Sequence, residues 1–144
     1  MIVLCDLDGT LSDLTHRLHN IQKDNPDWDK FFNECYKDKP IESIIELTTC
    51  LYEQGHEIYI TSGRSDAVRE KTMNWLNRHG VMWSKLIMRK SGDKRSDEIV
   101  KAEWLEDGSI DKHNVLFAID DRDRVVKMWR NLGVKCLQVA DGNF

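Results

Sequence analysis

The amino-acid sequence predicts an α/β fold in which a parallel sheet is flanked by helices on both faces. Five short apolar runs alternate with segments whose apolar residues recur at helical spacing, an order typical of parallel strands joined by helical crossovers. The length of 144 residues favours one domain spanning 1–144, which at this size buries roughly 70% of the surface of its unfolded chain. With 40% hydrophobic and 32% charged residues, the chain is too apolar to be disordered and too charged to be a membrane protein.

The first element is a short buried strand over Ile2–Cys5, which stops at the turn sequence Asp6-Leu7-Asp8-Gly9-Thr10. Polar segments with helical character follow over 11–23 and 28–37. Because a helix rises only 1.5 Å per residue, about thirty residues hold two short helices at most. We therefore expect 12–40 to form a small helical cap inserted after the first strand.

The middle of the chain repeats a helix–strand order. Apolar residues recur at helical spacing from Ile41, and Gly55 stands where a glycine ends a helix. A second strand is predicted over Glu57–Thr61, stopped by Ser62-Gly63-Arg64, and a helix then runs from Val68 to Gly80. A third, short strand is predicted over Lys85–Met88.

The last third of the chain completes the alternation. A helix is predicted over 96–106, followed by the most apolar strand, Val115–Ile119, which ends in Asp120-Asp121. A further helix ends at Gly133, and the last strand covers Lys135–Val139.

Charge and cysteine content narrow the function classes. A net charge of −4 argues against binding along a nucleic acid by charge alone, although a contact confined to one strand end remains open. The N-terminus has no basic and apolar signal segment, and no apolar run approaches the ~20 residues of a membrane span. The four cysteines lie far apart in no metal-binding spacing. We therefore expect a reduced, cytoplasmic protein.

Polar residues cluster where three predicted strands end. The clusters are Asp6 with Asp8, Ser62 with Arg64, and Asp120 with Asp121. The carboxyl ends of parallel strands share one edge of a sheet, and ligands of open α/β sheets bind at that edge. We therefore expect four carboxylates, one hydroxyl and one guanidinium to converge on a single crevice.

Four carboxylates in one crevice repel one another unless a cation or a proton offsets their charge. Carboxylate oxygens without histidine or cysteine suit Mg²⁺, which takes one or two carboxylates, waters and substrate phosphate. A phosphate site also needs basic groups, for which the candidates are Arg17, Arg64, Arg89 and Lys101. Asp97 lies four residues before Lys101 on the same predicted helix face and is expected to hold it in place.

The pair Asp6 and Asp8 suggests the chemistry. Two carboxylates spaced by two on an extended segment can point the same way. One can attack phosphorus as a nucleophile, while the other serves as general acid and then as base. Gly9 allows the tight turn that this arrangement needs.

These motifs resemble those of the haloacid dehalogenase (HAD) phosphohydrolase superfamily. Asp6-Leu7-Asp8-Gly9-Thr10-Leu11 is similar to its first motif, Ser62 to its second, Lys101 to its third and Asp120-Asp121 to its fourth. Further segments, among them Ile60 to Arg64, Gly92 to Lys101 and Ala118 to Trp129, together with Arg17, resemble the phosphatase domains of bacteriophage polynucleotide kinase–phosphatases. The resemblance covers most of the chain.

The resemblance implies a Rossmann-like fold and a Mg²⁺-dependent phosphomonoesterase that removes 3′-phosphates from DNA or RNA ends. It makes Asp6 the nucleophile and Asp8 the acid/base. Mg²⁺ would be held by the carboxylates of Asp6 and Asp121 and the backbone carbonyl of Asp8, with Asp120 in support. The other implied site residues complete catalysis or bind substrate; they are Thr10, Arg17, Ser62, Gly63, Arg64, Arg89, Asp97 and Lys101.

The resemblance also bears on partners. No Gly-x-x-x-x-Gly-Lys-Ser/Thr string occurs, so we expect no 5′-kinase activity from this chain. The resemblance is compatible with a separate kinase or ligase partner and with a homo-oligomer. It is also compatible with a protein of a bacterial or phage-infected cell.

Two other functions stay open. One is a HAD nucleotidase or another small-molecule phosphomonoesterase. The second is a catalytically silent module that binds phosphate ends, although the presence of all four acids argues against it. Among the remaining residues, Arg122, Arg124 and Arg130 are expected to be surface charges, and Trp28 in its polar segment is a candidate for stacking on a base.

Overall fold

A five-stranded parallel sheet forms the centre of the protein in the computed structural model, which describes residues 1–144. Its strand order is β5-β4-β1-β6-β7, and every neighbouring pair is parallel, which confirms the predicted α/β fold. The strands are β1 (Ile2–Cys5), β4 (Glu57–Ser65), β5 (Lys85–Arg89), β6 (Val115–Asp120) and β7 (Cys136–Gln138).

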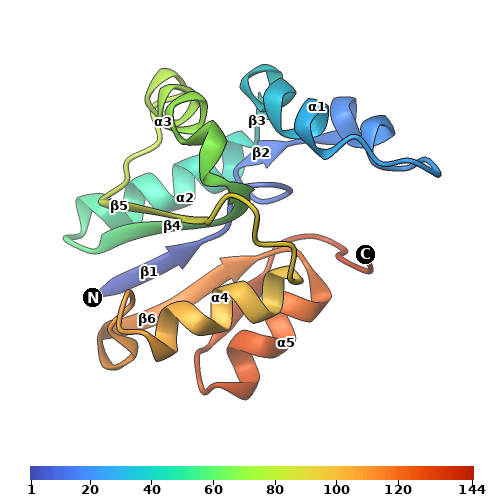
Figure 1. Ribbon diagram of the computed structural model, residues 1–144. Coiled ribbons are helices and arrows are strands. Elements are labelled where there is room, and N and C mark those ends of the chain that lie inside the picture. The colour runs from blue at the N-terminus through green and yellow to red at the C-terminus, as the bar shows by residue number, and fades with distance from the viewer.

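Helices cover both faces of this sheet (Figure 1). On one face lie α2 (Glu42–Glu53) and α3 (Arg69–Arg78), and on the other α4 (Asp97–Glu106) and α5 (Asp123–Asn131). β1 is buried along its whole length because it is the central strand, with helices on both sides. This explains why its sequence is continuously apolar rather than alternating.

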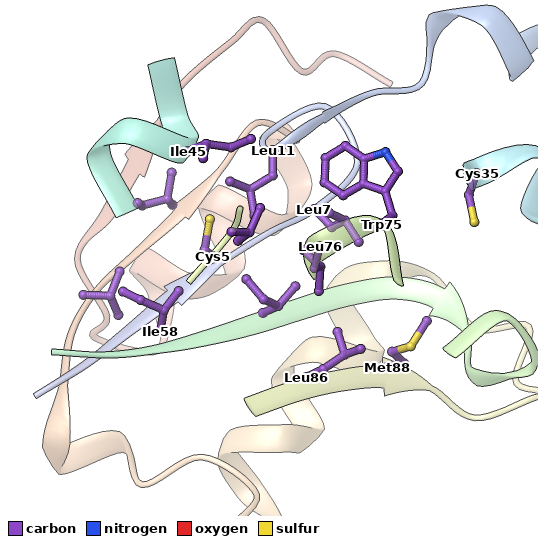
Figure 2. Close-up of a cluster of buried hydrophobic side chains, with 14 of the residues drawn as sticks. Cys5, Leu7, Leu11, Cys35, Ile45, Ile58, Trp75, Leu76, Leu86 and Met88 are labelled. Atoms are coloured by element: carbon purple, nitrogen blue, oxygen red, sulfur yellow. The ribbon is translucent and has the colours of Figure 1, made fainter. Parts of the chain in front are cut away.

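Each face has its own hydrophobic core. Figure 2 shows the first, in which Trp75 and Leu76 of α3 and Ile45 of α2 pack against β4 and β5. The second core joins α4 and α5 to the opposite face, where Trp104 and Trp129 are its largest side chains. Leu7 and Leu11 are fully buried in the first core and fix the loop that follows β1.

The insertion after β1 differs in part from the sequence prediction. A two-residue antiparallel ribbon of β2 (Ser12–Asp13) and β3 (Lys39–Pro40), which the sequence did not predict, closes its base. Between them the predicted helix over 11–23 is only a 3₁₀ segment, Thr15–Asn20, and the predicted helix over 28–37 is α1 (Trp28–Asn33) followed by 3₁₀ residues Glu34–Lys37. Segments this short lack the cooperative hydrogen bonding of a longer helix, so tertiary contacts decide their form.

The predicted strand ends also shift. β4 continues through the expected stop to Ser65, and its pairing with β5 becomes irregular between Ser62 and Ser65. The arrowheads of β1 and β6 point toward the side where the insertion and the C-terminus lie (Figure 1). This edge therefore collects the polar clusters. None of the helices combines the length and the apolar character needed to cross a membrane.

Candidate active site

A cavity of about 780 Å³ opens at the carboxyl edge of the sheet and brings together most of the residues predicted from sequence. The predicted residues that line it are Asp6, Asp8, Gly63, Arg64, Arg89, Asp97, Lys101, Asp120 and Asp121. Thr10, Arg17 and Ser62 are buried outside the lining. A shallower hollow, lined by Asp123 and residues 138–143, contains none of these side chains, so we assign the chemistry to the larger cavity.

The buried acids form a cluster of Asp6, Asp120 and Asp121, in which one carboxylate oxygen from each residue lies within 4.8 Å of the other two. Lys101 extends its ammonium into this cluster, with Nζ 2.7 Å from Asp6 Oδ1 and 2.9 Å from Asp120 Oδ2. Thr10 Oγ1 donates toward Asp6 Oδ2 at 3.1 Å and Asp121 Oδ1 at 3.3 Å. The contacts of Thr10 therefore orient two acids, and its predicted contact with substrate stays a prediction.

Backbone geometry forces the three acids together. The N–H of Asp6 donates to Ile119 O at 2.9 Å, so the pairing of β1 with β6 continues up to the acids. Gly9 has φ +83°, and a Cβ there would lie 2.1 Å from Asp121 Oδ2. Only glycine lets the loop after β1 approach Asp121 this closely.

Burial and mutual repulsion perturb these carboxyls. Burial, and then the neighbouring charge of Asp120, raise the pKa of both Asp6 and Asp121 above the ordinary value of an aspartate. Burial alone would lower the pKa of Lys101, but Asp120 and Asp6 outweigh it and raise that pKa, so the amine stays protonated.

The donor set fits a hard divalent cation. When the three carboxylates are ionised, Lys101 balances one of their charges and leaves two, which matches Mg²⁺. All the donors are oxygens, as Mg²⁺ prefers. The carboxylate of Asp8 is not part of this group, because it points toward arginines.

Two buried guanidinium groups donate hydrogen bonds to the carboxylate of Asp8. Arg64 donates from Nη2 to Asp8 Oδ1 at 2.7 Å and from Nε to both oxygens at 3.1 Å, while Arg17 Nη2 donates to Oδ1 at 2.6 Å. Burial alone would raise the pKa of Asp8, but Arg64 and Arg17 outweigh it and hold that pKa well below its ordinary value. The sequence predicts Arg17 and Arg64 as phosphate-binding groups. In the structure both contact the carboxylate of Asp8.

Asp38 completes this network, and sequence reasoning missed it. It is buried at the end of the insertion, where Arg17 Nε donates to Oδ1 and Arg17 Nη2 to Oδ2, both at 2.8 Å, and Arg64 Nη2 donates to Oδ2 at 3.1 Å. In the sequence, Asp38-Lys39-Pro40 looks like an ordinary turn, so nothing local marks it. Asp38 holds both arginines in the orientation in which they reach Asp8.

We expect Asp38→Ala to lower kcat by about 10- to 100-fold with little change in KM, because a group that orients a reacting side chain acts on the chemical step. It should also lower the free energy of unfolding by about 3–5 kcal/mol, since two buried guanidiniums lose a carboxylate. Asp38→Asn keeps a hydrogen-bond acceptor and should recover part of kcat. Steady-state kinetics and chemical denaturation measure these effects, with exposed Asp13→Ala as the control. Unchanged kcat in Asp38→Ala would show that Asp38 is only structural.

A second ion-pair group lies at the cavity mouth around Asp97. Its Oδ1 pairs with Arg89, and its Oδ2 accepts from Arg122 Nη1 at 2.8 Å. Gly63 lies directly beneath, where a Cβ would be 2.6 Å from Asp97 Oδ1. Asp97 and Lys101 both line the cavity, but they make no direct hydrogen bond or ion pair. The charge of Asp97 only adds to the effect by which Asp120 and Asp6 raise the pKa of Lys101.

The position of Arg122 differs from the one that the sequence predicts. The sequence predicts a surface charge, but Arg122 pairs with Asp97 and lines the cavity. This is because Asp120 Oδ1 accepts the backbone N–H of Arg122 and turns the chain into α5 there.

Ser62 is 1% exposed, and its Oγ accepts the backbone N–H of Arg64 at 3.1 Å. Its predicted contact with phosphate stays a prediction.

Comparisons with known proteins bear on this site. The sequence matches, over residues 1–144, the family described as the polynucleotide kinase PNKP phosphatase domain. It is 33% identical over 137 residues to a putative bifunctional polynucleotide kinase/RNA ligase of Autographa californica nuclear polyhedrosis virus, covering 92% of this chain and 18% of that protein.

Solved structures of other proteins have a similar fold. A Pnkp1/Rnl/Hen1 complex contains a chain with 34% identity and a TM-score of 0.83, over 99% of this chain and 47% of that one. A predicted phosphatase from Clostridium acetobutylicum has a TM-score of 0.67 at 15% identity, over 95% of this chain and 83% of that one, and shows the likeness of fold alone. The chain spans less than half the length of the first two relatives.

Proposed function

From the family to which the chain belongs, that of polynucleotide kinase PNKP phosphatase domains, we propose that it is a Mg²⁺-dependent phosphomonoesterase acting on the 3′-phosphate of DNA or RNA ends. The four motifs predicted a HAD-type phosphatase, and the further similar segments predicted this family within it. The observation that carries the proposal is the meeting of Asp6, Asp120 and Asp121 within 4.8 Å, in the cavity that Asp8 also lines. We further propose that 1–144 forms one catalytic domain with 12–40 as its small cap.

Asp6, Asp121 and the backbone carbonyl of Asp8 would hold Mg²⁺, with Asp120 in support. When bound, the ion supplies charge neutralisation for the phosphate and for the acids around it. Lys101 and Ser62 are proposed to bind the phosphate oxygens, and Thr10 to keep Asp6 and Asp121 in position. Gly63 and Arg89 shape the entrance.

The proposed reaction has two displacements at phosphorus. A carboxylate oxygen of Asp6 bonds to phosphorus, the bond from phosphorus to the sugar oxygen breaks, and Asp8 gives that oxygen a proton. Water then attacks the aspartyl-phosphate, Asp8 takes the water's proton, and inorganic phosphate leaves as the Asp6 carboxylate re-forms. Atoms and charges balance without any further reactant.

The environment of Asp8 suits the second displacement directly. Arg17 and Arg64 favour its ionised form, which is the form that accepts a proton from water. The first displacement needs the protonated form, and the negative charge of an arriving phosphate favours it, because a nearby like charge raises a carboxyl pKa.

A polymer end is the proposed substrate because the small insertion contributes only part of the cavity lining, through residues in and around its 3₁₀ segment and α1. Most of the other lining residues come from the strand ends, the loop after β5 and the start of α5. An open site of this kind admits a strand end, whereas small-molecule phosphatases more often close a lid over the substrate. The relatives named for polynucleotide kinase, RNA ligase and an Rnl-containing complex support a kinase or ligase partner.

The test is phosphate release from a 3′-phosphorylated oligonucleotide, compared with its 5′-phosphorylated isomer and with a 3′-mononucleotide. We expect the 3′ oligonucleotide to be preferred by at least about 100-fold in kcat/KM, equivalent to roughly 2.7 kcal/mol in transition-state free energy. EDTA should abolish release and excess Mg²⁺ restore it. Equal cleavage of mononucleotide and oligonucleotide would favour the nucleotidase instead, and activity that survives EDTA would exclude the metal.

A further inference from the structure

The cavity extends beyond the acids to an aromatic wall on the insertion. Trp28, Phe31 and Phe32 of α1 line it there, together with Leu14 and Leu18 of the preceding segment. Trp28 is 52% exposed although it is the largest side chain of α1. A core tryptophan of this protein looks different, since Trp75 and Trp129 are completely buried.

The aromatic wall is fixed to the reacting groups. Phe31 is 5% exposed and lies under Arg17, whose guanidinium carbon is 4.3 Å from the ring centroid. Arg17 Nη1 also donates to Phe31 O at 3.2 Å, and Arg17 Nη2 binds Asp8. Trp28 meets Phe31 edge-on at 5.7 Å and Phe32 at 5.9 Å between ring centroids. One chain of contacts therefore runs from Trp28 to the acid/base carboxylate.

The loop after β5 and the helix α5 bring unpaired positive charge to the same cavity. Arg89, Arg95 and Arg122 are engaged with carboxylates, but Lys94 and Arg124 are exposed, line the same cavity and form no ion pair. The cavity lining thus combines buried acids, the aromatic rings of α1 and two free cations. A nucleotide end has the complementary parts, which are a terminal phosphate, a flat base and a charged phosphodiester.

We propose that Trp28 is the platform on which the base of the 3′-terminal nucleotide stacks, while Lys94 and Arg124 contact the next phosphodiester; this inference rests on the proposed function and names its substrate contacts. Stacking on an aromatic ring tolerates any base, because every base has a π-face. The site would therefore accept 3′ ends of any sequence.

The experiment pairs a variant with a substrate change. One 3′-phosphorylated oligonucleotide keeps its terminal base, and a second is identical but abasic at the terminal nucleotide. With the intact substrate we expect Trp28→Ala to raise KM by about 5- to 150-fold, the loss that corresponds to one stacked base, with kcat nearly unchanged. With the abasic substrate the same variant should change KM by less than about twofold, because no stacking is left to lose. Trp28→Phe keeps a ring and should restore most of the affinity.

Tyr36→Ala is the matched control, since Tyr36 is an exposed aromatic residue of the same insertion that does not line the cavity. An equal rise in KM for both substrates, or none for either, would overturn the stacking platform while leaving the 3′-phosphatase proposal standing. If the wild-type protein releases no phosphate from the intact oligonucleotide, the proposed function itself fails, and the inference fails with it.

Discussion

Replacing Asp6 by asparagine is expected to abolish phosphatase turnover, with a loss of at least about 10⁴-fold in kcat, the scale seen when a nucleophile is removed. The amide that replaces the carboxylate has almost the same shape but cannot form the aspartyl-phosphate. The loss should appear equally with a generic aryl phosphate and with a 3′-phosphorylated oligonucleotide, because it concerns the reacting atom and not substrate recognition.

The fold should survive this substitution. Asp6 is buried beside Asp120 and Asp121, and repulsion among them, together with burial, raises its pKa. A neutral side chain removes that repulsion, while Lys101 keeps Asp120 as its partner at 2.9 Å. We therefore expect the melting temperature of Asp6→Asn, measured in EDTA, to equal or exceed that of the wild-type protein.

Asp107→Asn, at an exposed carboxylate that does not line the cavity, controls for charge removal in general. Unchanged turnover of aryl phosphate by Asp6→Asn would refute the assignment of Asp6 as nucleophile. A large loss of turnover together with a collapsed melting temperature would instead assign Asp6 a structural role.

The sheet and the meeting of its acids were predictable because both depend on patterns that are local in sequence. Continuous apolar runs mark buried parallel strands, and each run of β1 and β6 ends in acids. The rule that parallel strands share a carboxyl edge then places Asp6 and Asp121 together, although they are 115 positions apart. The apolar pattern of the strands and the parallel order of the sheet therefore both predict that these acids meet.

The network beneath Asp8 was not predictable, because it depends on how the insertion folds back. Asp38 reaches Arg17 and Arg64 only after the ribbon of β2 and β3 closes, and a two-residue ribbon leaves no periodic signal. The sequence predicts Arg17 and Arg64 near phosphate because they are cations. Both are buried, however, and a buried charge without a partner of opposite sign costs several kcal/mol, so each needs a carboxylate within the fold. In this fold the available partners were Asp8 and Asp38.

Replacing Arg64 by alanine is expected to lower kcat by about 10²–10³-fold, the typical effect of losing one preorganised charged donor at a reaction centre. Arg64 is completely buried and supplies three of the hydrogen bonds to the Asp8 carboxylate, as well as bonds to Asp38 and to Thr72 Oγ1 at 3.1 Å. Without it, Asp8 loses the stronger of its two anchors and can turn away from the phosphate. The same change leaves buried carboxylates short of a partner and should cost about 3–5 kcal/mol of unfolding free energy.

Arg64→Lys separates the charge of this residue from its shape, and it keeps the prediction testable if the alanine variant folds poorly. Lysine keeps the positive charge but has one donor nitrogen instead of a planar fork, so it cannot bind both oxygens of Asp8 and Asp38 together. We expect Arg64→Lys to be better folded than Arg64→Ala but still at least about tenfold slower than wild type in kcat. Exposed Arg69→Ala serves as the control for loss of a guanidinium, and kinetics are measured below each variant's melting temperature. If a folded Arg64 variant changes kcat by less than a few-fold, the anchoring of Asp8 does not limit the reaction. Arg17 and Arg64 would then serve only to neutralise the buried carboxylates of Asp8 and Asp38, without a role in the reaction.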